Sequence, residues 1–406
     1  MPIIFFIGVI LEFLFLPFQF YGDGQVRQHF IVELMRNRTI EPMKYSLIGP
    51  IFSFPLMMLE WVSHSNFWLI RYNFFLLCFA SFFLYRLLRT QKTKYFLFVF
   101  IAFLFLGSMF PGHIIHYYGE VFSATLMMLG IVLIQKNKTA LGWILVILSV
   151  GNTPATFFPL LVLCAYKIVK DKNWLYIFLP LITAISLIIE AKIRNPIASA
   201  GFTHYLFEDR GAPTLLPYSG RPGFSYPFIF GLMAQLISFG KGLLFFAPGL
   251  LFIPIVLKKL TDRNLREIFI LWLIYLSGLV LVYSKWWAWY GGWFWGPRFL
   301  LFASIPASFA LAFVLTHTAS KTMRLAVMLV TLWSFWVGTN GALLEQTGLD
   351  ICAANNYAFE HLCWYVPEFS PLFHPLVDKS PLALISVCIS FFLWFLFIRI
   401  NYNKRR

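Results

Sequence analysis

Two carboxylates stand at the ends of apolar segments, and their positions predict that they share one side of a membrane. Asp23 follows the first apolar segment in YGDGQVRQHF, and Glu120 follows the third in HYYGEVFSAT. Acids held together at a membrane boundary are candidates for cation binding or acid–base catalysis, because ionisable groups there are costly to leave unpaired. A structural alternative is that Asp23 simply caps an amphipathic helix by accepting its first N–H groups.

Basic residues predicted on the same side could neutralise a phosphate, and arginine does so best through two parallel hydrogen bonds. The candidates are Arg27, Lys44, Arg210, Arg221, Lys241, Lys285 and Arg298. For each one singly, the alternative is a cation that faces lipid headgroups. Arg298 stands apart because it opens an apolar segment directly after a tryptophan cluster.

That cluster has two interpretations. It comprises Trp286, Trp287, Trp289, Trp293 and Trp295 with Tyr290. Tryptophans commonly form a belt at the membrane interface. Aromatic faces also stack on sugars and isoprenoid tails, and this second interpretation makes Trp289 and Trp293 substrate-lining residues.

A divalent metal site is a further possibility near the second acid. His116 and Glu120 are four residues apart and would meet on one helix face, with His113 close by. Two imidazoles and a carboxylate could hold Zn²⁺ or a similar ion. The alternative is a set of ordinary hydrogen-bonded histidines, and no cofactor is required by the sequence.

The elements that position these residues are membrane helices. Hydrophobic residues make up 60% of the 406 residues and charged residues 12%, with a mean hydropathy of +0.75, which excludes an ordinary soluble domain. Segments near the 20 residues that span a bilayer predict an all-α bundle of about twelve crossings. They cover 2–20, 66–88, 94–111, 119–135, 173–191, 241–257, 267–284, 299–317, 324–340 and 381–400, with two short helices meeting at 151–154 inside 139–168.

Lysine and arginine support this topology, since short cytoplasmic loops retain positive charge. With the N-terminus inside, alternate loops collect 19 of the 32 basic residues, in clusters at 86–94, 136–138, 167–172, 258–266, 321–324 and 399–406. Both termini are then cytoplasmic, in a bacterial inner membrane. The net charge of +15 is explained by topology, so nucleic acid is not an expected partner.

The chain is expected to be one membrane domain, 1–406, elaborated on its outer face by 21–65, 192–240 and 341–380, without a soluble C-terminal domain. Within 21–65, Val26, Phe30, Ile31, Leu34 and Met35 recur at helical spacing while Arg27 faces elsewhere, which predicts an amphipathic helix in the interface. Cys352 and Cys363 share the last outer segment and could form a disulfide or remain free thiols.

Taken together, these features resemble the GT-C glycosyltransferases. The resemblance is to the bacterial branch of the dolichyl-phosphate-mannose protein mannosyltransferase family (glycosyltransferase family 39), which includes the aminoarabinose transferases of lipid A. It rests on the layout of the spans and on GDGQVRQHF, the Lys44 segment, YRLLR, the glycine-rich stretch 220–248 and WWAWYGGWFWGPRF. The single acid of GDG, where many relatives carry Asp–Glu, and Glu120 in place of Asp are departures.

The resemblance implies a GT-C-like bundle with juxtamembrane helices on its outer face and an inverting sugar transfer from a polyprenyl-phosphate donor. Asp23 matches the acid usually assigned as general base, and Glu120 the acid of the second outer loop. The donor phosphate would be bound by cations among Arg27, Lys44, Arg221, Lys241 and Arg298. The acceptor would be a lipid, a glycan or a protein, with membrane lipids as surroundings. The alternatives are a multi-pass transporter or lipid flippase, and an inactive GT-C-like scaffold.

Overall fold

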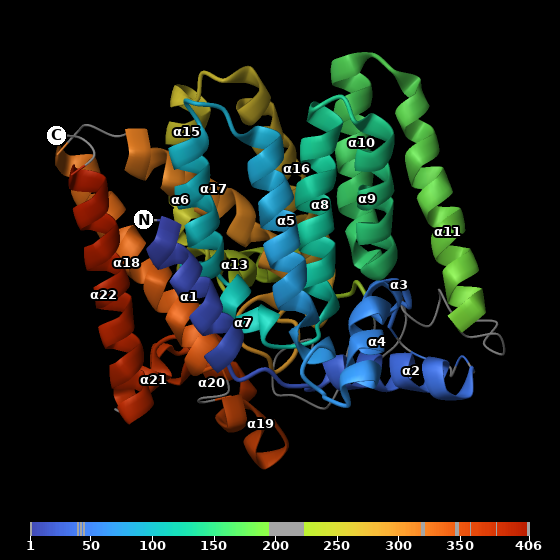
Figure 1. The fold of residues 1–406 in the computed structure, drawn as a ribbon, viewed down its shortest axis with the longest axis horizontal. Coiled ribbons are helices and arrows are strands. Elements are labelled where there is room, and N and C mark those ends of the chain that lie inside the picture. The colour runs from blue at the N-terminus through green and yellow to red at the C-terminus, as the bar shows by residue number, and fades with distance from the viewer. Residues whose placement is uncertain are drawn as a thin grey trace.

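The chain folds as a bundle of helices. The computed structural model describes residues 2–38, 40, 43, 45–194, 223–317, 321–345, 349–357, 359–378 and 380–403, and these contain no β-strand. Most helices stand side by side, as Figure 1 shows. The expected class, an all-α multi-pass membrane protein, is therefore confirmed.

Six helices in the described part of the chain are long and apolar enough to cross a bilayer. They are Leu69–Leu88, Trp174–Arg194, Arg263–Lys285, Arg298–His317, Met323–Leu343 and Pro381–Arg399. Shorter apolar helices occupy other predicted crossings, among them 94–106, 119–135 and 139–152. The total of twelve crossings remains a prediction.

Burial separates the centre of the bundle from its periphery. Two central helices, α8 (Gly119–Gln135) and α17 (Ser304–His317), are almost wholly buried. Around them stand α5 (Tyr72–Leu88), α6 (Lys94–Leu106), α9 (Thr139–Asn152), α10 (Phe157–Asp171), α16 (Arg263–Lys285) and α18 (Lys321–Leu343). The peripheral helices α1 (Pro2–Phe15), α11 (Phe178–Arg194) and α22 (Pro381–Asn403) expose apolar side chains, as lipid-facing helices do.

The prediction of one continuous span over 241–257 is wrong. The segment is broken into α14 (Leu243–Phe246), η4 (Pro248–Phe252) and α15 (Ile253–Lys259). Pro248 has no N–H with which to continue a helix. Gly249 packs so tightly on α17 that an added Cβ would lie 2.2 Å from the Ala307 carbonyl oxygen. The chain therefore bends where it crosses α17.

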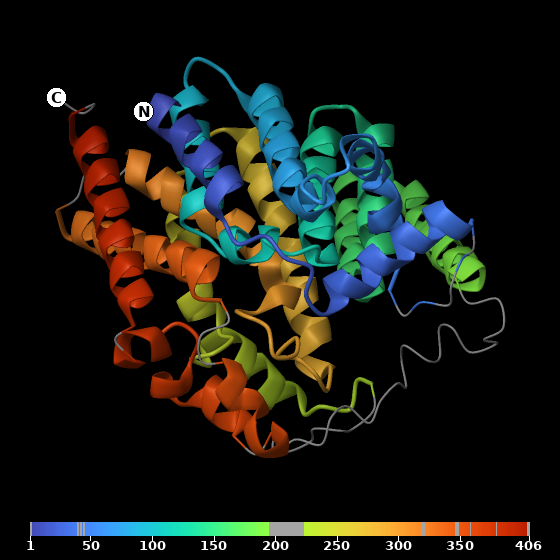
Figure 2. The ribbon, with the colours of Figure 1, turned by 60° about the horizontal axis from the view of Figure 1, so that its bottom comes forward.

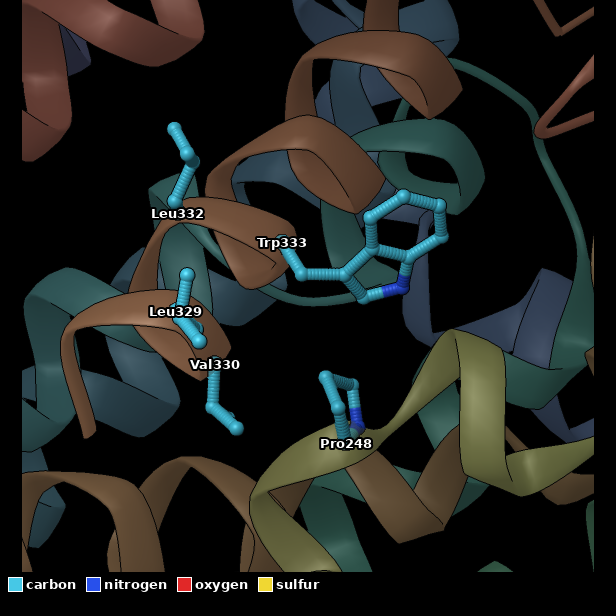
Figure 3. A pocket seen from close by; sticks show the side chains of 5 residues that line it. All are labelled: Pro248, Leu329, Val330, Leu332 and Trp333. Atoms are coloured by element: carbon cyan, nitrogen blue, oxygen red, sulfur yellow. The ribbon is translucent and has the colours of Figure 1, made fainter. Parts of the chain in front are cut away.

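An apolar groove lies beside this bend, between Pro248 and α18. It is lined by Leu329, Val330, Leu332 and Trp333 (Figure 3). The indole N–H of Trp333 donates to the Phe245 carbonyl at 2.8 Å. Because the indole N–H of Trp333 is already hydrogen-bonded and the other lining side chains are apolar, this groove suits hydrocarbon chains better than water.

The two ends of the bundle differ. At the upper end in Figure 1, short turns join α5 to α6, α8 to α9, α10 to α11 and α15 to α16. The opposite end, here called the elaborated end, carries α2 (Asp23–Asn37), α3 (Ile48–Phe52), α4 (Phe54–Ser63), α19 (Leu349–Tyr357), α20 (Glu360–Tyr365) and α21 (His374–Asp378) (Figures 1 and 2). Two further short helices are α7 (Phe110–Ile114), which precedes α8, and α13 (Phe228–Ile237), which packs on α16.

Helix α2 confirms the helix expected in 21–65 but corrects its orientation. Arg27, expected on a different face from Phe30 and Ile31, is buried with them at 7% exposed, whereas Val26, expected on their face, is 45% exposed. Arg27 points inward because Asn152 and the Ser46 carbonyl accept hydrogen bonds from its guanidinium there. Arg27 therefore occupies the inner face of α2 in place of Val26. Asp23 begins α2 but does not cap it, since the N-cap residue is Gly22 and no side chain accepts a capping bond there.

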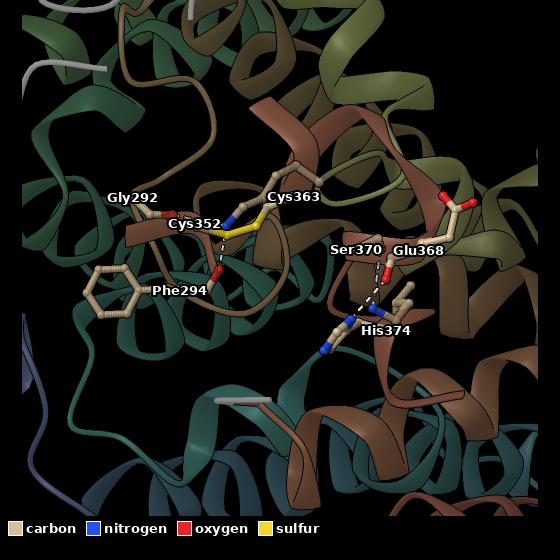
Figure 4. The surroundings of a disulfide bond; sticks show 9 residues. Gly292, Phe294, Cys352, Cys363, Glu368, Ser370 and His374 are labelled. Carbon is tan, nitrogen blue, oxygen red and sulfur yellow. Dashed lines mark hydrogen bonds between the residues drawn. A yellow bond between two sulfur atoms is a disulfide. The ribbon is translucent and has the colours of Figure 1, made fainter. Parts of the chain in front are cut away.

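The disulfide, one of two alternatives for the outer cysteines, is present between Cys352 and Cys363 (Figure 4). It joins α19 to α20 at the elaborated end. Both cysteines are buried, so the bond lies inside this small helical layer.

Candidate active site

A single guanidinium joins the two acids. Arg298 Nη1 donates to Asp23 Oδ2 at 2.7 Å, and Arg298 Nε lies 3.7 Å from Glu120 Oε1. The three side chains come from the starts of α2, α8 and the 3₁₀ helix η5 (Arg298–Ala303). They are mostly buried, with exposed fractions of 8% for Arg298, 18% for Asp23 and 16% for Glu120. Segments far apart in sequence thus form one charged cluster.

Aromatic rings surround the guanidinium. The Arg298 Cζ atom lies 4.1 Å from the ring centre of Phe294, 5.2 Å from that of Phe299 and 5.7 Å from that of Tyr118. These distances are in the range of cation–π attraction. The rings therefore favour a fixed, charged Arg298 between the acids.

Asp23 is an ionised carboxylate with both oxygens engaged. The Tyr45 hydroxyl donates to Oδ1 at 2.5 Å while Arg298 holds Oδ2. Burial would raise the pKa of Asp23, but the charge of Arg298, the bonds from Tyr45 and Arg298, and the charge of Arg27 together lower it below its usual value. Burial and the neighbouring Asp23 raise the pKa of Tyr45, which keeps this hydroxyl protonated.

A small cavity lies next to the cluster, between α8, α16 and η5. Glu120 and Arg298 line one part of it, and Ser123, Thr153, Thr156, Tyr275 and Tyr283 contribute hydroxyl groups elsewhere. About 20 Å³ is available to the centre of a water molecule, enough for one ordered water. The acids therefore adjoin a space lined by hydrogen-bonding groups.

Arg27 lies one helical turn after Asp23, below the surface. Its Nη1 donates to Asn152 Oδ1 at 3.3 Å and to the Ser46 carbonyl at 3.5 Å, and its guanidinium lies 5.1 Å from the Tyr45 ring centre. Asn152 in turn donates to the Gly119 carbonyl at 2.8 Å, next to Glu120. Arg27 therefore ties α2 to the start of α8, and its charge reaches Asp23.

Lys241, expected among the phosphate-binding cations, is buried beneath the loop that precedes Arg298. Its ammonium donates to the carbonyls of Gly292, Phe294 and Gly296 at 3.1, 2.5 and 2.9 Å. The side chain of Lys241 is thus committed to backbone acceptors in this structure.

The tryptophan cluster packs mainly into protein. Trp289 is 3% exposed, and its ring centre lies 6.2 Å from that of Tyr365 on α20 and 5.7 Å from that of Tyr290. Trp295 is 2% exposed and donates to Asn340 Oδ1 at 2.7 Å. Trp293 is partly buried and packs against the core. Trp289 and Trp295 therefore do not form a lipid-facing belt, because their rings are covered by other residues.

The expected pairing of His116 with Glu120 is wrong, because α8 begins only at Gly119 and helical spacing does not apply. The Nε2 of His116 instead pairs with Glu345, which also accepts from Gln19 at 2.9 Å. Burial, followed by the charges of His116 and Arg298, lowers the pKa of His113 well below its usual value. In the described part of the chain no three His, Cys, Asp or Glu side chains cluster as a metal site would require.

Lys44, Arg210 and Arg221 lie outside the described residues. Sequence reasoning missed Tyr45, Tyr118, Asn152 and Glu345. Tyr45 and Tyr118 stand beside Lys44 and Glu120 in the segments already singled out, so proximity in sequence could have suggested them. Asn152 and Glu345 carry no local signal, because only the fold brings them to the cluster.

Comparison with known proteins addresses the fold. The chain matches no known family profile and no curated protein. It is similar in structure to ArnT from Cupriavidus metallidurans, a GT-C aminoarabinose transferase whose crystal structure contains undecaprenyl phosphate. The TM-score is 0.58 at 10% sequence identity, over 99% of this chain and 77% of that one. The chain therefore has the GT-C fold, as its motifs had suggested.

Proposed function

We propose that this protein is an inverting glycosyltransferase that moves a sugar from a polyprenyl-phosphate donor to an acceptor lipid, glycan or protein. The observation that carries this proposal is the Asp23–Arg298–Glu120 cluster at the elaborated end of a GT-C fold. A carboxylate that can accept a proton lies beside a cation that can neutralise a phosphate, and the transfer requires both functions.

The chemistry is a single displacement. The acceptor hydroxyl oxygen attacks the anomeric carbon, and its proton passes to Asp23. The bond between the anomeric carbon and the phosphate oxygen breaks, and the electron pair leaves with the lipid phosphate. Arg298 neutralises the charge of this leaving group.

Donor binding would also prepare the base. Arg298 is the nearest cation that lowers the pKa of Asp23, and burial acts in the opposite direction. A phosphate that attracts Arg298 would break its hydrogen bond to Asp23 Oδ2. The pKa-lowering effect of Arg298 on Asp23 would then weaken, while the pKa-raising effect of burial would remain. The pKa of Asp23 would then rise, which makes the carboxylate a better proton acceptor.

The proposed orientation places the elaborated end in the periplasm of a bacterial inner membrane, with both termini cytoplasmic. The support is the distribution of basic residues, since the clusters at 86–94, 136–138, 167–172 and 258–266 lie around the short turns at the opposite end (Figure 1). The sugar would then be transferred on the periplasmic face of the inner membrane.

The decisive experiment supplies purified protein with polyprenyl-phosphate-linked pentoses and hexoses together with membrane extract as acceptor, and measures released polyprenyl phosphate. Asp23→Asn keeps the shape and accepts from Tyr45 but removes the base, so release should fall at least 100-fold while unfolding stays cooperative. The control is Glu33→Gln on the same helix, whose carboxylate contacts Asn37.

Equal rates for wild type and Asp23→Asn would refute the assigned base. A flippase would instead move a labelled lipid across vesicle membranes without breaking its sugar–phosphate bond. An inactive scaffold would bind polyprenyl phosphate and release nothing from any donor.

A further inference from the structure

The amine of Lys241 is buried, and burial, followed by the charge of Arg298, lowers its pKa well below the usual value. The side chain is 1% exposed and has three acceptors, the carbonyl oxygens of Gly292, Phe294 and Gly296. A protonated lysine has three N–H donors, so the three acceptors match its full capacity. A neutral amine has only two N–H donors, so the three carbonyl acceptors favour the protonated form and act against burial.

Two of these acceptors lead directly to Arg298. The Gly296 carbonyl also accepts from the backbone N–H of Arg298 at 3.1 Å, so Lys241 and Arg298 share one acceptor. Phe294, whose carbonyl Lys241 holds, places its ring 4.1 Å from the Arg298 guanidinium. The position of Arg298 therefore depends on the backbone that Lys241 fixes.

The loop that precedes Arg298 is rich in glycine and requires interactions that fix its backbone. Gly291, Gly292 and Gly296 have φ values of +75°, +80° and +64°, a region that is costly for other residues but open to glycine. Glycine-rich backbone loses much conformational entropy on ordering. A central donor that gathers three inward-facing carbonyls offsets part of that cost.

Lys241 is itself anchored on α20. The Gly240 N–H donates to the Trp364 carbonyl at 3.1 Å, and the Lys241 ammonium lies 4.5 Å from the Trp364 ring centre. A Cβ on Gly240 would lie 2.1 Å from the Cys363 carbonyl oxygen, so the two backbones are in tight contact. The Trp364 and Tyr365 rings of α20 lie 5.5 Å from the Tyr290 ring and 6.2 Å from the Trp289 ring, so the disulfide-linked layer packs against the residues that precede this loop.

We propose that Lys241 is a positioning residue, which fixes the loop 291–297 and thereby holds Arg298 between Asp23 and Glu120. In this role Lys241 contacts neither the polyprenyl-phosphate sugar donor nor the molecule that accepts the sugar. The activity readout below rests on the proposed function, whereas the structural readout does not.

The structural test is hydrogen–deuterium exchange of the ligand-free protein in detergent. Lys241→Met keeps the length of the side chain and removes its three donors, so amide exchange in peptides covering 290–298 should accelerate at least tenfold. Lys241→Arg keeps a buried cation with donors and should fall between Lys241→Met and wild type. Lys258→Met, at an exposed lysine of α15, is the matched control and should not change this segment.

The functional test asks whether Lys241 acts through Arg298. Lys241→Met should lower turnover at least tenfold. Combined with Arg298→Ala, it should add little to the loss caused by Arg298→Ala alone, because the residue that it positions is already absent. Additive losses would overturn the proposal.

The two readouts separate this proposal from the proposed function. Faster exchange over 290–298 in a protein without transferase activity would support the positioning role and refute the proposed function. Unchanged exchange with polyprenyl-phosphate affinity reduced tenfold to a hundredfold would make Lys241 a phosphate ligand and overturn the proposal. If Lys241→Met does not fold, Lys241→Gln, which has two N–H donors instead of three, decides by the same exchange measurement.

Discussion

Replacement of Arg298 by alanine should destabilise the fold in a pH-dependent way. In the wild-type protein one cation serves two carboxylates, none of the three side chains being more than 18% exposed. Removal of one partner from a buried ion pair costs about 3–5 kcal/mol. Tyr45 still donates to Asp23 in the variant. We therefore expect Arg298→Ala to lower the free energy of unfolding by about 3 kcal/mol at pH 7, near the lower end of that range.

The sign of the pH dependence follows from the pKa of Asp23. In the wild type this pKa is lowered, so the ionised carboxylate stabilises the fold above its unfolded pKa of about 3.9, and that contribution is lost as the pH falls through the folded value. In Arg298→Ala, burial is opposed only by Tyr45 and Arg27, so the pKa should rise above the unfolded value. The variant should then become more stable on acidification from pH 7 to pH 5, where the wild type changes little.

The assay is SDS-induced unfolding in one detergent at several pH values. Asp23→Asn in the Arg298→Ala background removes the uncompensated carboxylate, so it should recover part of the lost stability and flatten the pH dependence. Arg266→Ala, at an exposed arginine near the start of α16, is the control. If Arg298→Ala is as stable as Arg266→Ala at pH 7, and Asp23→Asn restores nothing, then the charged cluster is not the buried ion pair described above.

Two other predictions concern the elaborated end. Cys352 and Cys363, separated by 11 residues, should react with an alkylating reagent only after reduction, and alkylation without reduction, measured by intact mass, would contradict the disulfide. Replacing both cysteines with serine should lower the free energy of unfolding by roughly 2–3 kcal/mol. In cells whose native cysteines have been replaced, an impermeant maleimide should label Val26→Cys directly but Arg266→Cys only after permeabilisation, and the reverse pattern would invert the proposed orientation.

Local signals in the chain were sufficient to locate most of the helices. Runs of apolar residues close to the bilayer thickness located most of the bundle, because each such run satisfies its own backbone hydrogen bonds as a helix. The same logic failed at 241–257, where Pro248 and the packing of Gly249 on Ala307 break the run. It failed again on α2, where helical periodicity grouped Val26 with Phe30 and Ile31 and separated Arg27 from them, whereas the structure buries Arg27 and exposes Val26.

The sequence by itself determined the membrane class, the helical content and the choice of Asp23, Glu120 and Arg298 as notable residues, because hydropathy and residue type are local properties. Only the tertiary structure decided that one arginine joins both acids across 275 residues of chain, and that Lys241 serves a loop rather than an open surface. The physical reason is that a buried charge must find its partner in three dimensions. That partner is set by helix packing, which no single segment encodes.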